Sequence, residues 1–214
     1  MASNYADQRR DYTMGGLSDE DMPTSPFELF GRWLEQAVDA SLADPTAMAL
    51  STIDAEGRPW QRLVLLKGFS SDGFVFYTNY GSEKAEAISR ESRVSLLFPW
   101  NELERQVIVG GRAEKVVAAE SAAYFLSRPE ESQLAAWASR QSRPISSKAV
   151  LEQAFSDIKA KFAHGDIPVP DFWGGYRVVP ERIEFWQGGA HRLHDRYRYT
   201  LADDGDWHWQ RLQP

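Results

Sequence analysis

The stretch Trp186-Gln187-Gly188-Gly189-Ala190-His191-Arg192-Leu193-His194-Asp195-Arg196 organises the predicted fold, because it joins two segments with strand-like patterns. Residues 183–186 lead into it, and residues 195–201 follow it with alternating apolar and polar character. The two glycines are expected to supply backbone angles that other residues resist. If the strand pattern continues, period-2 geometry puts Arg192, His194 and Arg196 on one face.

Two fixed positive charges around a titratable imidazole suit an anionic ligand that must gain or lose a proton. The alternative interpretation is a surface hairpin with solvated charges, because arginines are mostly exposed. This stretch alone leaves both interpretations open.

The composition indicates a globular protein of 214 residues, 43% of them hydrophobic and 26% charged. Eight tryptophans and eight tyrosines indicate an aromatic core, a flat ligand, or both. The net charge of −7 argues against a general nucleic-acid binder. The absence of cysteine excludes disulfides and thiolate metal sites. No apolar run approaches the roughly 18 residues that span a bilayer, and the polar N-terminus lacks a signal-peptide pattern. A cytoplasmic protein is therefore expected.

Hydrophobic periodicity predicts an α+β barrel of mostly antiparallel strands with flanking helices. Residues 1–24 are polar and predict a mobile arm, and residues 25–214 predict a single domain. Ser25 is the expected N-cap of the first helix, with Glu28 closing a capping box. Helices are predicted from residue 26 to about 44 and over 82–90, 119–126, 130–138 and 146–162. Strands are predicted over 47–53, 60–66, 74–78, 94–98, 105–117, 173–179, 183–186, 195–201 and 207–212.

Two local patterns favour phosphate binding. Ser82 and Lys84 stand at a predicted helix N-terminus, where free amides attract anions. Tyr124, Arg128 and Ser132 are spaced four apart, so a helix brings them to one phosphate. The alternatives are a simple Ser cap with a solvated lysine, and an amphipathic surface row.

Familiar catalytic patterns are missing from the sequence. There is no Gly-x-Ser-x-Gly elbow, no cysteine nucleophile, and no Rossmann or P-loop glycine pattern. His191 and His194 are three apart on a strand-like stretch without an apparent third ligand, so no metal site is predicted.

Many uncommon strings are spread over the chain from Arg9 to Pro214. They include Arg10-Asp11-Tyr12-Thr13, Leu42-Ala43-Asp44-Pro45-Thr46-Ala47-Met48, Arg62-Leu63-Val64-Leu65-Leu66-Lys67, Phe76-Tyr77-Thr78-Asn79, Ser95-Leu96-Leu97-Phe98-Pro99-Trp100, Leu103-Glu104-Arg105-Gln106-Val107, Ser127-Arg128-Pro129, Phe172-Trp173-Gly174-Gly175 and His191-Arg192-Leu193-His194-Asp195-Arg196. Through these strings the chain resembles the pyridoxine/pyridoxamine 5′-phosphate oxidase family.

The resemblance implies an α+β fold built on an FMN-binding split β-barrel, with a C-terminal dimerisation segment and FMN at the interface of a homodimer. It implies oxidation of pyridoxine 5′-phosphate or pyridoxamine 5′-phosphate to pyridoxal 5′-phosphate, the last step of vitamin B6 cofactor synthesis and salvage. Oxygen would accept the electrons and yield hydrogen peroxide, and the amine substrate would also release ammonia.

By matching position, the resemblance also implies a set of site residues. Arg192 and His194 would stand at the reacting carbon as the catalytic pair. Arg9 and Tyr12 would close over the substrate, whose phosphate would be held by Lys67, Tyr124, Arg128 and Ser132. The implied FMN contacts are Arg62, Leu63, Val64, Leu65, Leu66, Lys67, Tyr77, Thr78, Ser82, Lys84, Gln106, Gln141, Ser142, Trp186 and Arg196.

One position departs from the family pattern. Glu83 stands where the family commonly has Arg or Lys beside the flavin phosphate, which predicts slightly weaker FMN affinity. Three other functions were weighed: a non-catalytic flavin or pyridoxal phosphate binder, a related FMN oxidase such as one in phenazine assembly, and a purely structural dimer. The substrate set of Tyr124, Arg128, Ser132, Arg192 and His194 disfavours the first two, and the many arginines, which would lack a purpose, disfavour the third.

Overall fold

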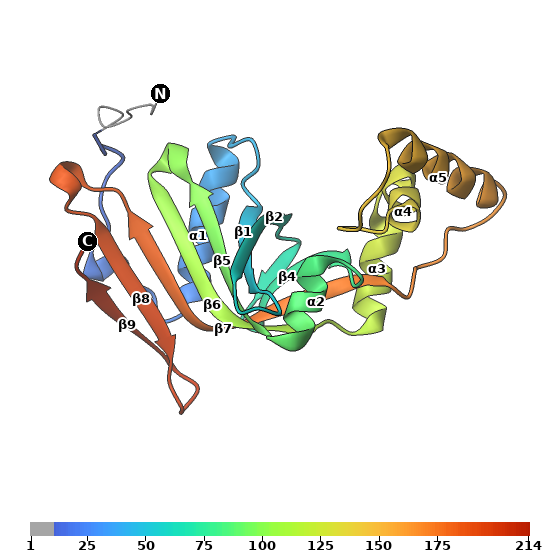
Figure 1. Cartoon of the computed structure of the whole chain (residues 1–214). Helices are drawn as coiled ribbons and strands as arrows, with labels where there is room; N and C mark the ends of the chain where they lie inside the picture. The colour runs from blue at the N-terminus through green and yellow to red at the C-terminus, as the bar shows by residue number, and fades with distance from the viewer. Residues whose placement is uncertain (1–10) are drawn as a thin grey trace, which may run out of the picture. The chain divides into compact units, whose positions relative to one another are not determined.

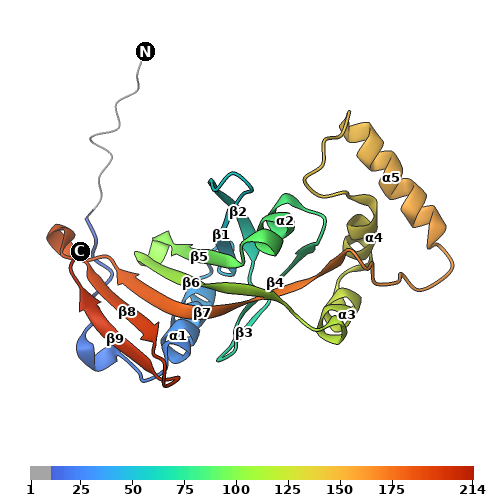
Figure 2. The same ribbon diagram turned by 60° about the horizontal axis from the view of Figure 1, so that its bottom comes forward.

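The computed structural model describes residues 11–214 (Figures 1 and 2). Its helices are α1 (Pro26–Asp39), α2 (Glu83–Arg90), α3 (Ala118–Ser127), α4 (Glu130–Ala138) and α5 (Lys148–Lys161). Its strands are β1 (Ala47–Ile53), β2 (Pro59–Leu65), β3 (Gly68–Ser70), β4 (Gly73–Asn79), β5 (Arg93–Trp100), β6 (Arg105–Lys115), β7 (Trp173–Gln187), β8 (Asp195–Leu201) and β9 (Trp207–Leu212). The short strand β3 was not predicted, and the two strands expected within 173–186 form one continuous strand.

The antiparallel sheet has the order β2-β1-β5-β6-β7-β4-β3, and β8 and β9 extend from β7. In the described part of the chain this hydrogen-bonded path ends at β2 and β3, so the sheet is not closed into the expected barrel. The mixed helix and strand class is confirmed. Gly205, with φ of 90°, forms the predicted turn between β8 and β9.

The chain divides into two compact units. Unit 1 comprises Met1–Ala49, Leu96–Gly110 and Pro180–Pro214, and unit 2 comprises Leu50–Ser95 and Gly111–Val179. Strands β1, β5, β6 and β7 each run from one unit into the other. The division into residues 1–24 and a single domain of 25–214 stays a prediction.

The core of unit 1 is aromatic. Helix α1 buries Phe30 against Phe98, with ring centroids 4.9 Å apart, and Trp33 against Phe185, at 5.3 Å. Pro26 begins the helix as predicted, because its missing N–H costs nothing there. The predicted capping box at Ser25 is wrong, because the Ser25 side chain accepts no cap hydrogen bond. A capping box occurs instead at Ser18 and Asp21.

The core of unit 2 has a cluster of Phe125, Leu134, Ile167 and Trp173. Helix α5 contributes Phe155 and Ile158 to its edge, yet buries no residue completely. None of the helices in residues 11–214 is both long and apolar enough to cross a membrane.

Candidate functional site

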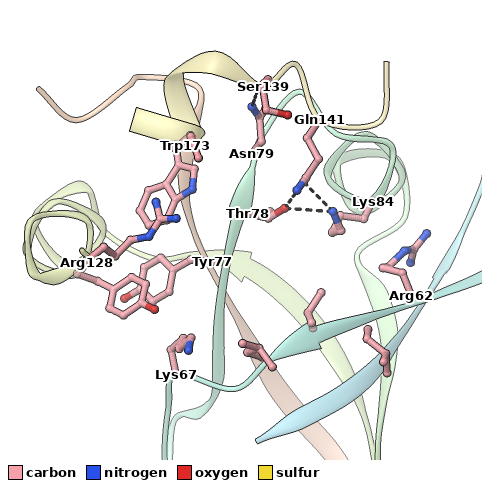
Figure 3. A pocket seen from close by; sticks show the side chains of 16 residues that line it. Arg62, Lys67, Tyr77, Thr78, Asn79, Lys84, Arg128, Ser139, Gln141 and Trp173 are labelled. Atoms are coloured by element: carbon pink, nitrogen blue, oxygen red, sulfur yellow. Dashed lines mark hydrogen bonds between the residues drawn. The ribbon is translucent and has the colours of Figure 1, made fainter. Parts of the chain in front are cut away.

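A cavity of about 430 Å³ lies in unit 2. Strand β2 and the residues after it form one part of its wall, and residues of β4, α2, α3, α4, the loop after α4 and the start of β7 form the rest. Figure 3 shows its side chains from close by. The sequence-predicted residues that line it are Arg62, Leu63, Val64, Leu65, Lys67, Tyr77, Thr78, Lys84, Tyr124, Arg128 and Gln141. Four other predicted residues, Leu66, Ser82, Ser132 and Ser142, are not part of this lining.

One end of the cavity is centred on Lys84. Its side chain is buried, and its Nζ atom donates to Gln141 Oε1 at 2.8 Å and to Thr78 Oγ1 at 3.3 Å (Figure 3). Burial, helped by the nearby charge of Arg62, lowers the pKa of the Lys84 ammonium to about 8, and the charge of Glu83 opposes this shift. Within residues 11–214, Lys84 forms no ion pair with a carboxylate. A buried cation held only by neutral oxygen atoms suits an anionic ligand.

The lowered pKa predicts that anion binding at Lys84 depends on pH. The ammonium is fully charged below the lowered value, and it loses its proton as the pH rises through about 8. The affinity of the protein for a phosphate ligand should therefore fall between about pH 7 and about pH 9. Titrations across this range should show the loss in the wild type and a nearly flat profile in Lys84→Met. Identical profiles for the two proteins would contradict the prediction.

The other end of the cavity contains Arg128. Its Nη1 atom is buried and has no hydrogen-bond partner among the described residues. Its guanidinium carbon lies 4.9 Å from the centre of the Trp173 ring, and burial lowers the pKa of the group. Since buried polar groups are normally paired, this free donor indicates a place for a ligand oxygen. Figure 3 shows Arg128 and Lys84 on opposite sides of β4.

Aromatic rings stack beside Arg128. The Tyr77 ring lies 4.0 Å from that of Tyr124 and 5.4 Å from that of Trp173, with interplanar angles of 19° and 8°. These three rings pack on one another and form part of the wall of the cavity. The cavity thus combines two separate cationic ends with a flat apolar wall.

The predicted helical row of Tyr124, Arg128 and Ser132 is interrupted. Helix α3 ends at Ser127, and Arg128 is extended, with φ of −74° and ψ of 152°. Pro129 explains the break, because the residue before a proline is disfavoured in the helical region. Tyr124 and Arg128 still line the cavity, whereas Ser132 lies in the first turn of α4, outside the lining.

The turn between β7 and β8 differs from the expected continuous strand. Residues Ala190–Arg192 form a 3₁₀ turn, in which His191 and Arg192 have φ of 55° and 64°. Period-2 alternation therefore does not apply, and Arg192 is exposed. The expected role of the glycines is also wrong, because neither Gly188 nor Gly189 has a positive φ. A glycine is required at position 189 because any side chain would collide with the backbone: a Cβ there would lie 2.2 Å from the carbonyl oxygen of Leu193.

Gly189→Ala should therefore destabilise the folded protein. The added methyl group meets backbone that cannot move away cheaply, so we expect a loss of roughly 1–3 kcal/mol in the free energy of unfolding. Urea denaturation measures this loss. Gly165→Ala is the matched control, because a Cβ there meets nothing within 4 Å. Equal midpoints for the two variants would contradict the crowding at Gly189.

His194 is held by the same turn in unit 1. Its Nδ1 atom accepts a hydrogen bond from the Gly189 N–H at 3.1 Å, so in the neutral ring the proton is on Nε2. Its ring lies 4.6 Å from that of Trp186 and 5.2 Å from that of Tyr12. Trp186 and Tyr12 also line a second cavity, of about 510 Å³, with Gln106, Glu104 and Arg105. Glu104 and Arg105 were missed from the sequence, because each reaches this place through long-range contacts that no local pattern signals.

Arg196 forms an ion pair with Glu184. Its guanidinium donates to Glu184 Oε1 at 2.7 and 3.0 Å, and Arg198 donates to the other oxygen of the same carboxylate at 3.0 Å. A contact of Arg196 with FMN therefore stays a prediction. Arg9, predicted to close over the substrate, lies outside the described residues.

Comparison with protein families gives two matches that together cover most of the chain. Residues 34–162 match the family described as Pyridoxamine 5'-phosphate oxidase. Residues 173–214 match the Pyridoxine 5'-phosphate oxidase C-terminal dimerisation region.

Individual relatives match over almost their full length. A pyridoxine/pyridoxamine 5'-phosphate oxidase from Vibrio vulnificus is 58% identical, over 98% of this chain and 99% of its own. One from Aeromonas hydrophila is 56% identical, over 99% and 100%.

Among solved structures, PhzG from Burkholderia lata, crystallised with tetrahydrophenazine-1-carboxylic acid, is 30% identical. It has a TM-score of 0.85 over 91% of this chain and 95% of its own. A pyridoxamine 5'-phosphate oxidase-related, FMN-binding protein from Nostoc punctiforme is 17% identical, with a TM-score of 0.73 over 90% and 100%, which supports the fold alone.

Proposed function

This chain belongs to the pyridoxine/pyridoxamine 5′-phosphate oxidase family, and from that premise we propose how its residues divide the reaction. The protein oxidises pyridoxine 5′-phosphate or pyridoxamine 5′-phosphate to pyridoxal 5′-phosphate, in vitamin B6 cofactor synthesis and salvage. FMN, when bound, would supply the redox chemistry at the C4′ carbon, with O2 as the electron acceptor and hydrogen peroxide as its product.

The observation that supports this proposal is the pair of cationic ends of the unit 2 cavity, neither of which is paired with a carboxylate in residues 11–214. Lys84 is buried without a carboxylate, and Arg128 Nη1 is buried without any partner in the described residues. FMN and the substrate each carry one phosphate, so the residues present fit two phosphorylated ligands. We assign the FMN phosphate to Lys84 and Arg62, and the substrate phosphate to Arg128, Tyr124 and Lys67.

Both phosphate sites act by position. A substrate that is bound through its phosphate holds its C4′ carbon at a fixed position. The reaction then needs no chance encounter between substrate and flavin, because both are already bound in place. The phosphate clamp at Arg128 supplies this anchoring, and the stacked rings of Tyr77, Tyr124 and Trp173 form part of the wall beside it.

We assign the proton of the substrate's C4′ oxygen or nitrogen to Arg192 and His194. The Gly189 N–H, bonded to Nδ1, fixes the ring of His194 so that its Nε2–H can donate a hydrogen bond to that oxygen or nitrogen. Trp186 and Gln106 line the 510 Å³ cavity of unit 1 and are assigned to the flavin ring.

The match of residues 173–214 to a dimerisation region supports a homodimer. We propose that FMN lies at its two-fold interface, and that the open sheet is the framework of an FMN-binding split barrel. Under this proposal each site draws residues from both copies.

The test of the function is direct. The purified protein should be yellow, and pyridoxine 5′-phosphate or pyridoxamine 5′-phosphate in air should produce hydrogen peroxide, with ammonia from the amine only. Tetrahydrophenazine-1-carboxylic acid, the compound bound in the PhzG structure, is the control substrate. A colourless protein that FMN does not reconstitute, or peroxide from the control substrate alone, would contradict the proposal.

Glu83 gives a further prediction about FMN affinity. It is exposed, and its charge acts on both Arg62 and Lys84. Glu83→Arg should remove a repulsion from the flavin phosphate and tighten FMN binding several-fold, about 1 kcal/mol or less because exposed charges are screened. Fluorescence titration of the FMN-free protein measures the change. Glu83→Gln should produce about half of it, and no gain in either variant would mean that solvent screens the carboxylate completely.

A further inference from the structure

We propose that Glu104 and Asp195 are positioning residues whose carboxylates fasten residues 12–17 to the turn between β7 and β8, and so hold Tyr12 against Trp186 and His194. All of these residues belong to unit 1. The proposal rests on the proposed function, because it assigns the fastened segment to the reaction site of the oxidase.

Glu104 makes the first attachment. Its Oε2 atom accepts hydrogen bonds from two successive backbone N–H groups, those of Thr13 at 2.7 Å and Met14 at 2.9 Å. The side chain is buried, and the residue has the left-handed angles φ 55° and ψ 37°. A buried carboxylate that receives two backbone N–H groups forms charge-assisted bonds, which are stronger than neutral ones.

The backbone of Glu104 binds the other side of this contact, the turn between β7 and β8. Its carbonyl oxygen accepts from the Gly188 N–H at 2.7 Å and from Gln187 Nε2 at 3.2 Å. One residue therefore joins the N-terminal segment, through its side chain, to the β7–β8 turn, through its main chain. A change at its carboxylate alone should release the segment and leave the turn attached.

Gly188 leaves the space that Tyr12 fills. A Cβ on Gly188 would lie 2.5 Å from Cδ1 and 2.8 Å from Cγ of the Tyr12 ring. That ring meets Trp186 edge-on, at 5.6 Å between centroids, and His194 edge-on, at 5.2 Å. Gly188 thus serves the contact between Tyr12 and the assigned proton-handling histidine.

Asp195 makes the second attachment, immediately after His194. Its Oδ2 atom accepts from the Leu17 N–H at 3.0 Å, while Oδ1 pairs with Arg211. A Cβ on Gly16 would lie 3.3 Å from the same Oδ2 atom, so a residue without a side chain allows the close approach. The two carboxylates hold the segment at both ends of a stretch that begins with Tyr12.

The experiment compares Glu104→Ala with Glu102→Ala in the FMN-loaded enzyme. Glu102 lies in the same turn and is exposed, so the control removes an equal charge without touching the segment. Hydrogen exchange should accelerate at the Thr13 and Met14 amides in Glu104→Ala only. The kcat/KM for pyridoxine 5′-phosphate should fall roughly 10- to 100-fold, because displaced side chains forfeit the bound geometry.

Glu104→Gln supplies the rescue. Its amide oxygen can accept both N–H groups, so exchange protection and most of kcat/KM should return, while FMN content stays equal in all variants. A role of Glu104 in general stability would instead lower the unfolding midpoint without a selective effect at residues 13 and 14.

A double-mutant cycle tests whether Gly188 acts through Tyr12. Gly188→Ala alone should lower kcat/KM about as much as Tyr12→Ala, and the double variant should be no worse than Tyr12→Ala, since the two changes remove one contact. Additive losses would overturn the assignment of Gly188.

Unchanged exchange at Thr13 and Met14 in Glu104→Ala would overturn the proposal, as would an unchanged kcat/KM despite accelerated exchange. A wild-type protein that does not oxidise either substrate would contradict the proposed function instead. In that case the exchange comparison still decides whether Glu104 fastens the segment.

Discussion

Arg128→Ala should raise the KM for pyridoxine 5′-phosphate by roughly 30- to 700-fold while the enzyme keeps its FMN. The guanidinium is buried, and its Nη1 atom has no hydrogen-bond partner in residues 11–214. Its N–H donors are therefore available to a ligand. Truncating one partner of a buried, hydrogen-bonded charge pair costs about 2–4 kcal/mol, and each 1.4 kcal/mol is tenfold in affinity.

Two comparisons make this result specific. Arg90→Ala removes an exposed charge from the last turn of α2 and should leave KM within about twofold. Arg128→Lys keeps the charge but loses the planar fork that matches a phosphate, so it should recover only part of the affinity. An unchanged KM in Arg128→Ala would show that the substrate phosphate binds elsewhere.

Lys84→Met should weaken FMN binding by roughly 30- to 700-fold and leave the FMN-free protein at least as stable as the wild type. Methionine fills a similar volume without a charge, so the phosphate loses a buried partner worth about 2–4 kcal/mol. The folded protein at the same time no longer has to bury an ammonium that has no carboxylate partner in residues 11–214. A variant with weaker FMN binding but unchanged or higher stability does not have a folding defect, because a folding defect would lower both.

Fluorescence titration with FMN and thermal unfolding of the FMN-free protein measure the two quantities. Lys148→Met is the control, because Lys148 is 86% exposed and pairs with Glu152 on the same helix, away from the cavity lining. If Lys84→Met lowered the unfolding midpoint and left the FMN affinity unchanged, Lys84 would be a structural residue rather than a phosphate ligand.

Local patterns predicted the elements that depend on neighbouring residues. The strand expected over 47–53 is β1, and the helix expected over 130–138 is α4. Such elements are readable because side-chain periodicity and turn residues lie within a few positions of one another. The points where helices end were harder to predict. The four-residue spacing of Tyr124, Arg128 and Ser132 suggested one continuous helix, yet Pro129 ends the helix before Arg128.

The sequence by itself determined the family, the helices and most of the strands, and the kinds of side chain available for two phosphates, because these are properties of local pattern and of residue type. Only the tertiary structure decided that Lys84 is buried without a carboxylate, that Arg196 is paired with Glu184, and that Glu104 receives the N–H groups of Thr13 and Met14. Burial and charge pairing depend on residues as many as 178 positions apart in the chain, as for Leu17 and Asp195. Their free energies arise only when folding removes water from both partners.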